Sequence, residues 1–126
     1  MRAITTGLIA GCLLAACAAQ PPITLPPALP FRAYDQGFEL QWAIERSSDV
    51  VRAVGTASIS RTTVTMVTLN FFGLDADGGI VSRGIALVHG PFGDRPQPFA
   101  TQLRPDGREV RFELRVALVQ EGGLTR

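Results

Sequence analysis

The chain has no lysine, a single histidine and no cysteine beyond position 17. All 12 basic side chains are therefore arginine, and against 11 acidic ones they leave a formal net charge of only +1. A near-neutral chain without a run of like charges offers no electrostatic surface for nucleic acid. Metal sites and acid–base catalysis need clustered ligands or a paired nucleophile, so we expect no metal, no cofactor and no enzymatic activity.

Long hydrophobic runs are also missing, because the longest apolar stretch covers only residues 3–16 and is interrupted by Thr5, Thr6 and Gly7. A membrane-spanning helix needs about 20 apolar residues, so this stretch is too short to cross a bilayer. One early positive charge at Arg2, a short apolar run and small residues at its end are typical of a secretory signal peptide. The pattern predicts that residues 1–16 are removed after export.

Leu14-Ala15-Ala16-Cys17 resembles the lipobox of bacterial lipoproteins, in which a branched apolar residue and two small ones precede a cysteine. The resemblance implies that Cys17 receives a diacylglycerol on its sulfur, becomes the new N-terminus and is acylated on its amine, with palmitate as a typical acid. Several acyl chains together give durable membrane binding. The residue after the cysteine is Ala18 and not Asp, which in enteric bacteria is compatible with export to the outer membrane. By this analogy we expect a domain on the outer membrane that faces the periplasm or the exterior.

Two other interpretations of the cysteines remain open at this point. Ile9-Ala10-Gly11-Cys12 also fits the lipobox pattern, although cleavage there leaves an apolar core of about nine residues, short for a signal peptide. It also leaves the apolar residues 13–16 on the mature chain. A Cys12–Cys17 disulfide is the remaining interpretation, but both cysteines lie within one secretory signal, so a fold stabilised by disulfides is excluded.

Residues 18–30 contain five prolines, at positions 21, 22, 26, 27 and 30. Such a segment disfavours helix and prefers extended polyproline II at ~3.1 Å per residue, so thirteen residues span at most about 40 Å. We expect residues 17–37 to form a tether between the lipid and the domain. The alternative, a proline-rich ligand for a groove-type module, lacks a Pro-x-x-Pro motif with a flanking arginine.

From Phe38 onward the sequence predicts strands separated by turns. Apolar residues alternate over 38–45, and aliphatic, Thr and Phe residues fill 50–60, 62–72 and 80–89, with Gly55 expected at a bulge. Short strands follow at 98–103 and 110–118, after turn signals at 47–49, 75–79, 90–96 and 105–107. Strands at this spacing without an amphipathic helix indicate a small antiparallel β-sandwich of six or seven strands over 38–121, followed by a frayed end at 122–126. The residues expected first in its core are Phe38, Trp42, Phe112 and Leu114.

Phe72-Gly73-Leu74-Asp75, followed by Asp77-Gly78 and a strand, resembles the FxLYD group of bacterial immunoglobulin-like domains. Gly90-Pro91 and the strand around Phe112 come in the corresponding order, so the resemblance covers about residues 51–116. The tyrosine of the group name is missing, and Ser58-Ile59-Ser60 stands where an Asn commonly follows the Gly-containing strand. The resemblance implies an immunoglobulin-like sandwich without enzymatic activity.

Three groups of residues are candidates for a reactive site. Asp75-x-Asp77-x-Gly79 is similar to the start of a calcium loop, but Ala86 stands where the bidentate Glu belongs, which favours an exposed turn. His89 at a strand end has no neighbouring ligand in the sequence. A Ser–His–Asp arrangement with Ser58, Ser60 or Ser82 has no Gly-x-Ser-x-Gly context.

The loop over residues 91–96 is the candidate interaction loop, because binding on rigid sandwiches usually resides in loops. Phe92 and Arg95 would form an exposed aromatic–arginine pair of the kind found in interface hot spots, or Phe92 would pack under the edge of the core. The sequence thus predicts a lipid-anchored envelope protein that acts non-catalytically through a protein partner. The alternatives are a ligand or metal binder, or an enzyme, that uses the Asp75–Asp77 turn or His89, and a passive structural protein.

Overall fold

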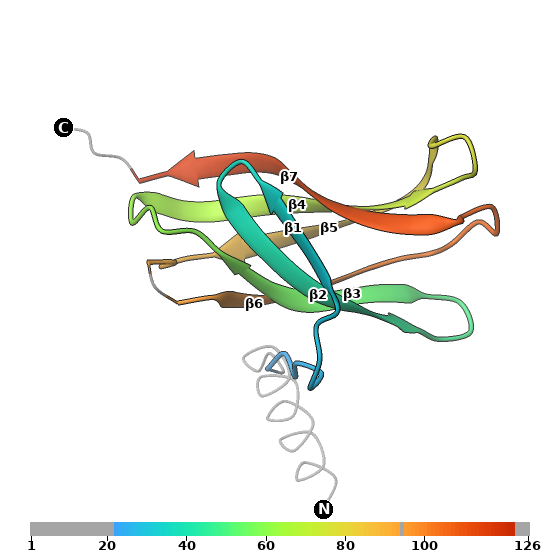
Figure 1. Cartoon of the computed structure of the whole chain (residues 1–126), viewed down its shortest axis with the longest axis horizontal. Helices are drawn as coiled ribbons and strands as arrows, with labels where there is room; N and C mark the ends of the chain where they lie inside the picture. The colour runs from blue at the N-terminus through green and yellow to red at the C-terminus, as the bar shows by residue number, and fades with distance from the viewer. Residues whose placement is uncertain (1–21, 94, 123–126) are drawn as a thin grey trace, which may run out of the picture.

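The computed structural model describes residues 22–93 and 95–122, so the predicted signal peptide, Cys12 and Cys17 lie outside the described residues. The described residues form seven antiparallel strands: β1 (Phe31–Asp35), β2 (Phe38–Arg46), β3 (Val51–Ser58), β4 (Val64–Leu74), β5 (Ile80–His89), β6 (Gln97–Leu103) and β7 (Arg111–Glu121). They build a four-stranded sheet in the order β1-β2-β3-β6 and a three-stranded sheet in the order β5-β4-β7. The two sheets stack as layers, so the predicted all-β sandwich is confirmed (Figure 1). Within the described ranges, no helix has the length and apolarity needed to cross a membrane.

The strand order is similar to that of the immunoglobulin-like class of sandwiches. With β2, β3 and β6 as strands A, B and E, and β5, β4 and β7 as C′, C and F, both sheets follow the order of that class. β1 is an additional strand outside A. The described chain has no strand after β7, so β7 lies at an edge of its sheet.

β1 lies within residues 17–37, which the sequence predicts to be a tether. The sheet therefore begins at Phe31 and not at Phe38. β1 pairs with β2 from Phe31↔Trp42 to Asp35↔Phe38. The two strands are joined by Gln36 and Gly37, whose φ angles are 50° and 85°. Positive φ at both central residues is the hairpin geometry that matches the twist of the strands.

The described part of the proline-rich segment does not extend away from the domain as expected of a stalk. Pro22 to Pro27 line a groove together with Glu45, Arg52 and Ala100, which lie on the outer face of the four-stranded sheet. Val54 points to that same outer face, between Ala43 and Ala100, and is only 1% exposed. The segment therefore packs on the β1-β2-β3-β6 sheet (blue in Figure 1).

The core lies between the two sheets and contains three of the four expected residues, Phe38, Trp42 and Leu114, whereas Phe112 is only partly buried against it. The prediction of a bulge at Gly55 is wrong, because Gly55 pairs in register with both Trp42 and Phe99. A Cβ atom there would fall on the carbonyl oxygen of Gln41. Gly55 is therefore required by the close approach of two strands.

The register shifts between Val64 and Met66 and between Gly73 and Leu74 of β4. A further irregularity lies in β7, where Thr68 pairs with Leu118 but Leu69 pairs with Val116. Ala117 is the extra residue of this bulge, and the inward alternation of β7 changes phase there. Val116 is buried, whereas Leu118 is 54% exposed.

Both open sides of the sandwich are closed by side-chain hydrogen bonds. On one side, the Thr101 hydroxyl of β6 donates to the carbonyl oxygen of Ile85 on β5 at 2.9 Å. On the other side, Val116 N–H donates to the Asp35 carboxylate at 2.7 Å, and the Gln36 amide donates to Val116 O at 3.1 Å. The β1–β2 hairpin tip thus provides hydrogen-bond partners for the backbone N–H and C=O of Val116 at the outer edge of β7.

Candidate functional site

The candidate interaction loop does not present the expected aromatic–arginine pair. Phe92 is 1% exposed and packs edge-on against Phe38, with ring centroids 5.4 Å apart. Arg95 is exposed, so the two side chains do not form an exposed pair, although both border a small hollow with Pro91 and Gly93. The interpretation of Phe92 as a side chain under the core edge is the one that the structure supports.

The conformation of the Asp75–Asp77 turn is stabilised by hydrogen bonds to the Asp75 carboxylate. The Asp75 Oδ1 atom accepts hydrogen bonds from Asp77 N–H at 3.0 Å and from Gly79 N–H at 2.8 Å. Such an Asx-turn stabilises a tight hairpin. In residues 22–93 and 95–122, no three His, Cys, Asp or Glu side chains come together in a way that would hold a metal ion.

His89 lies exposed at the end of β5, and among the described residues no hydrogen bond or ion pair joins its side chain to another group. Ser82, one of the serines weighed for a nucleophilic site, donates its hydroxyl to Glu109 at 2.7 Å. The structure therefore does not bring His89 and Ser82 into a hydrogen-bonded pair of the kind that activates a nucleophile.

Glu109 organises the β6–β7 loop. Its carboxylate accepts from Ser82 Oγ at 2.7 Å, from Asp106 N–H at 2.8 Å and from Gly107 N–H at 3.0 Å. Partial burial acts to raise the pKa of Glu109, but these hydrogen bonds outweigh it, so the pKa lies below its ordinary value. The carboxylate is a structural group of this loop.

A pH titration of stability tests this assignment. A carboxyl whose pKa is lowered by folding stabilises the native state above its unfolded value of about 4.3, and this contribution is lost as pH falls through the folded pKa. We expect Glu109→Gln to reduce the loss of unfolding free energy between about pH 5 and pH 3. Glu45→Gln, which alters an exposed carboxylate on β2, is measured beside it as the matched control. An unchanged slope in Glu109→Gln contradicts the assignment.

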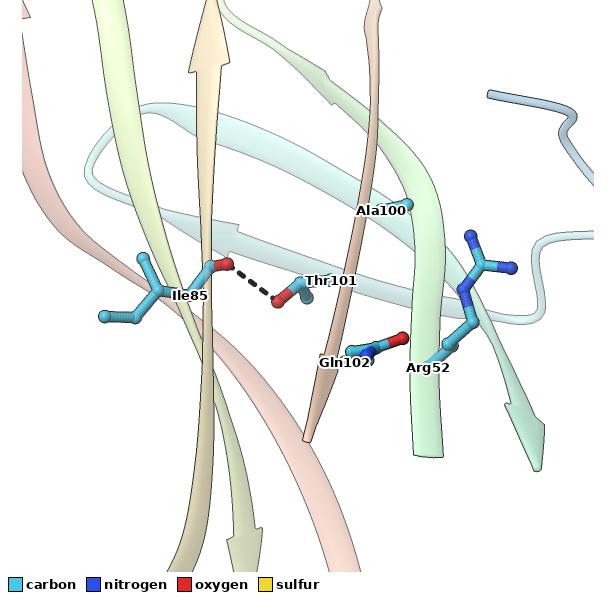
Figure 2. A pocket seen from close by; sticks show the side chains of 5 residues that line it. All are labelled: Arg52, Ile85, Ala100, Thr101 and Gln102. Atoms are coloured by element: carbon cyan, nitrogen blue, oxygen red, sulfur yellow. Dashed lines mark hydrogen bonds between the residues drawn. The ribbon is translucent and has the colours of Figure 1, made fainter. Parts of the chain in front are cut away.

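A hollow of about 300 Å³ lies where β5 and β6 meet, lined by Ile85, Thr101, Gln102, Ala100 and Arg52 (Figure 2). The Thr101 hydroxyl is already donated to Ile85, and the Arg52 guanidinium pairs with Glu45 at 3.3 Å. The volume is at the low end for small-molecule sites, and the Thr101 hydroxyl and the Arg52 guanidinium are already engaged, which does not favour a ligand there. The hollow is the junction of the two sheets.

The outer face of the three-stranded sheet is the surface that stands out, and we call it the β5–β4–β7 face. The registers align its side chains in four rows across β5, β4 and β7: His89–Met66–Gln120, Leu87–Thr68–Leu118, Ile85–Asn70–Arg115 and Arg83–Phe72–Glu113. Three of these are large hydrophobic side chains more than half exposed: Ile85 at 57%, Leu87 at 59% and Leu118 at 54%. Hydrophobic residues exposed singly are ordinary, but a cluster marks an interaction site.

The last row of this face combines an aromatic ring with charges. The guanidinium carbons of Arg83 and Arg115 lie 5.4 and 5.1 Å from the centroid of Phe72, which is thereby only 6% exposed. Glu113 pairs with Arg115 at 2.7 Å and with Arg111 at 3.2 Å. These ion pairs lower the pKa of Glu113, against burial that raises it, so the carboxylate remains charged. The row therefore presents an arginine on β5 and, on β7, a carboxylate that is already bound by two arginines of the same strand.

This face did not emerge from the sequence patterns, although β5 contained a signal for it. Ile85 and Leu87 alternate with Ala86 and Val88, so both faces of the strand are apolar and only one can face the core. Leu118 joins the face through the bulge, which strict alternation does not reveal.

Comparisons with known protein families, curated proteins and solved structures give no match for the chain. The resemblances to bacterial lipoproteins and to FxLYD domains stay predictions. The N-terminal motif and the β5–β4–β7 face are therefore the features of the chain that bear on its function.

Proposed function

We propose that the chain is a lipid-anchored protein of the bacterial cell envelope whose sandwich acts without catalysis, through contact with protein. The observation that carries this proposal is the Leu14-Ala15-Ala16-Cys17 motif at the end of a short apolar run that begins after Arg2. Acylation of Cys17 attaches the mature chain to a membrane, with the outer membrane favoured by Ala18 and the domain in the periplasm or outside.

The contact role is supported by the chemistry of the described residues. The carboxylates of Asp75 and Glu109 accept hydrogen bonds from the backbone of their own turn and loop. The candidate reactive residues of the described chain are not brought together into one site. The surface that remains in need of an explanation is the apolar cluster on the β5–β4–β7 face, and such clusters mark protein contacts.

Intact mass of the protein isolated from membranes tests the anchor. We expect a mature chain that begins at Cys17 and carries acyl groups, and we expect Cys17→Ser to lose both the added mass and the membrane association. Cys12→Ser is the matched control, because it removes the competing cysteine, and it leaves the mass of the mature chain unchanged. An unmodified chain, or acylation lost only in Cys12→Ser, contradicts the assignment of Cys17.

A further inference from the structure

We propose that the mature protein lies on the membrane surface with the outer face of its β1-β2-β3-β6 sheet turned toward the lipid headgroups. We call this surface, together with residues 22–27 on it, the N-terminal face. The inference rests on the anchor at Cys17 proposed above and adds the side of the domain that meets the membrane. Three observations carry it: the packing of the proline-rich segment, the short reach that this packing leaves, and two exposed aliphatic side chains close to the anchor.

The described part of the proline-rich segment belongs to the surface of the domain and does not act as a spacer. Pro22 to Pro27 line a groove with Glu45 and Arg52 on the outer face of the sheet. Val54, which points to the same face, is only 1% exposed. The described chain thus begins on the side of this sheet that is opposite to β4, β5 and β7 (Figure 1). An anchor that holds the chain before Pro22 therefore pulls on this side of the domain.

The distance between the lipid and the domain is limited by the residues that precede Pro22. Five steps of the chain separate Cys17 from Pro22, and a fully extended chain of this length spans at most about 18 Å. The two sheets are stacked about 10 Å apart and carry side chains on their outer faces. A connection of this reach is too short to pass an edge strand and run around both sheets. The β5–β4–β7 face is therefore held on the side of the domain that points away from the membrane.

Ile23 and Leu25 supply the N-terminal face with apolar groups for the membrane interface. They are 38% and 39% exposed, although they belong to a segment that lines the groove on the sheet. They follow Cys17 by six and eight positions. Aliphatic side chains that bury themselves at the boundary between headgroups and acyl chains strengthen the attachment that an acyl anchor provides. The two side chains thus bring the N-terminal face into contact with the lipid surface.

The charges of the N-terminal face are paired with one another. Arg32 of β1 lies 3.3 Å from Glu39 of β2, and Arg52 of β3 lies 3.3 Å from Glu45 of β2. Two arginines and two glutamates cancel, so these residues give the face no net attraction to anionic lipids. The proposed contact therefore depends on the anchor and on the aliphatic side chains, and we expect it to be insensitive to salt.

The β5–β4–β7 face carries the charge that an anionic membrane would attract. Arg83 and Arg115 lie in neighbouring rows of this face, whereas the Glu113 carboxylate is already bound by Arg115 and Arg111. Attraction between charges alone would turn this face toward the lipid, but the short connection to Cys17 turns it away. The two arrangements predict opposite results in one measurement. The arrangement that we propose leaves the apolar cluster of the β5–β4–β7 face accessible to a protein partner.

Fluorescence quenching on lipid vesicles measures which face meets the membrane. The acylated protein is reconstituted in vesicles of phosphatidylethanolamine and phosphatidylglycerol that contain a phospholipid with a nitroxide on its headgroup. A bimane is attached to Leu25→Cys or, as the matched control, to Leu87→Cys, because both leucines are exposed and lie on opposite faces. Cys17 offers no free thiol once its sulfur carries the diacylglycerol. We expect the label at position 25 to be quenched several-fold more strongly than the label at position 87.

The same measurement at high salt separates the proposed contact from an electrostatic one. Raising the salt from about 0.1 M to about 1 M shortens the Debye length from about 10 Å to about 3 Å, and we expect the quenching at position 25 to persist. Its loss at high salt overturns the proposal. Equal quenching of the two labels, or stronger quenching at position 87, overturns the orientation and leaves the anchor intact. Intact mass of the same samples distinguishes the remaining case, because a chain without acyl groups that stays off the vesicles contradicts the anchor and the orientation together.

Discussion

Gly55→Ala is expected to lower the free energy of unfolding by about 3 kcal/mol, which is a large part of the stability of a small domain. Gly55 lies in the middle of β3, between Trp42 of β2 and Phe99 of β6. A Cβ atom there would overlap the carbonyl oxygen of Gln41 and lie 2.7 Å from Trp42 Cα. Both obstacles are backbone atoms of a central strand pair, so relief requires the two strands to separate.

Chemical denaturation followed by far-UV circular dichroism measures this effect, and the fluorescence of Trp42, the single tryptophan, provides a second probe beside the mutated site. Gly79→Ala is the matched control, because its added methyl meets only the Asp75 side chain, at 3.3 Å. We expect that variant to stay within about 1 kcal/mol of the wild type. A Gly55→Ala protein as stable as Gly79→Ala contradicts the close approach described for β2 and β3.

Phe38→Ala is expected to cost about 4 kcal/mol of unfolding free energy. Phe38 is completely buried at the start of β2, and its ring packs edge-on against Phe92. Truncation leaves a cavity between two sheets that are joined along both sides, so the surrounding strands cannot close around it. The loop that contains Phe92 also loses its contact with the core, and we expect it to become more sensitive to proteolysis.

Denaturant midpoints and limited proteolysis together measure this prediction. Phe31→Ala is the control, because Phe31 is 44% exposed and stacks on Trp42 with ring centroids 5.7 Å apart. A stacked aromatic pair at the surface contributes about 1 kcal/mol, so the control variant should be only mildly destabilised. Equal losses in the two variants contradict the central place of Phe38 in the core.

Most of the sandwich could be predicted because local chemistry and tertiary structure agree in its strands. Alternation in β2 places Phe38 and Trp42 inside, and the Asp75 turn has the residues that its hydrogen bonds require. β1 escaped prediction because its two-residue turn begins with Gln36, a residue that rarely adopts the positive φ it has here.

The features that the sequence did not reveal depend on partners distant along the chain. Proline content predicts an extended segment, but not the sheet face on which Pro22 to Pro27 lie. Val54 could have indicated this packing, since it is an apolar residue at an outward position of β3 and is buried only if another segment lies over the outer face of the sheet. The outward turn of Leu118 likewise depends on the pairing between β4 and β7, which strand alternation alone does not fix.

The hydrogen bonds between the β1–β2 hairpin tip and Val116 also set the order in which the domain can be completed. They join groups 80 and 81 positions apart, and β7 is the last described strand to leave the ribosome or any channel through which the chain is threaded from its N-terminus. Before β7 arrives, the tip has no partner, and β4 lacks the strand on one of its sides. Contacts of such long sequence separation slow folding. The first hairpin therefore gains its partner only when the last described strand is available, and the sandwich stays open until then.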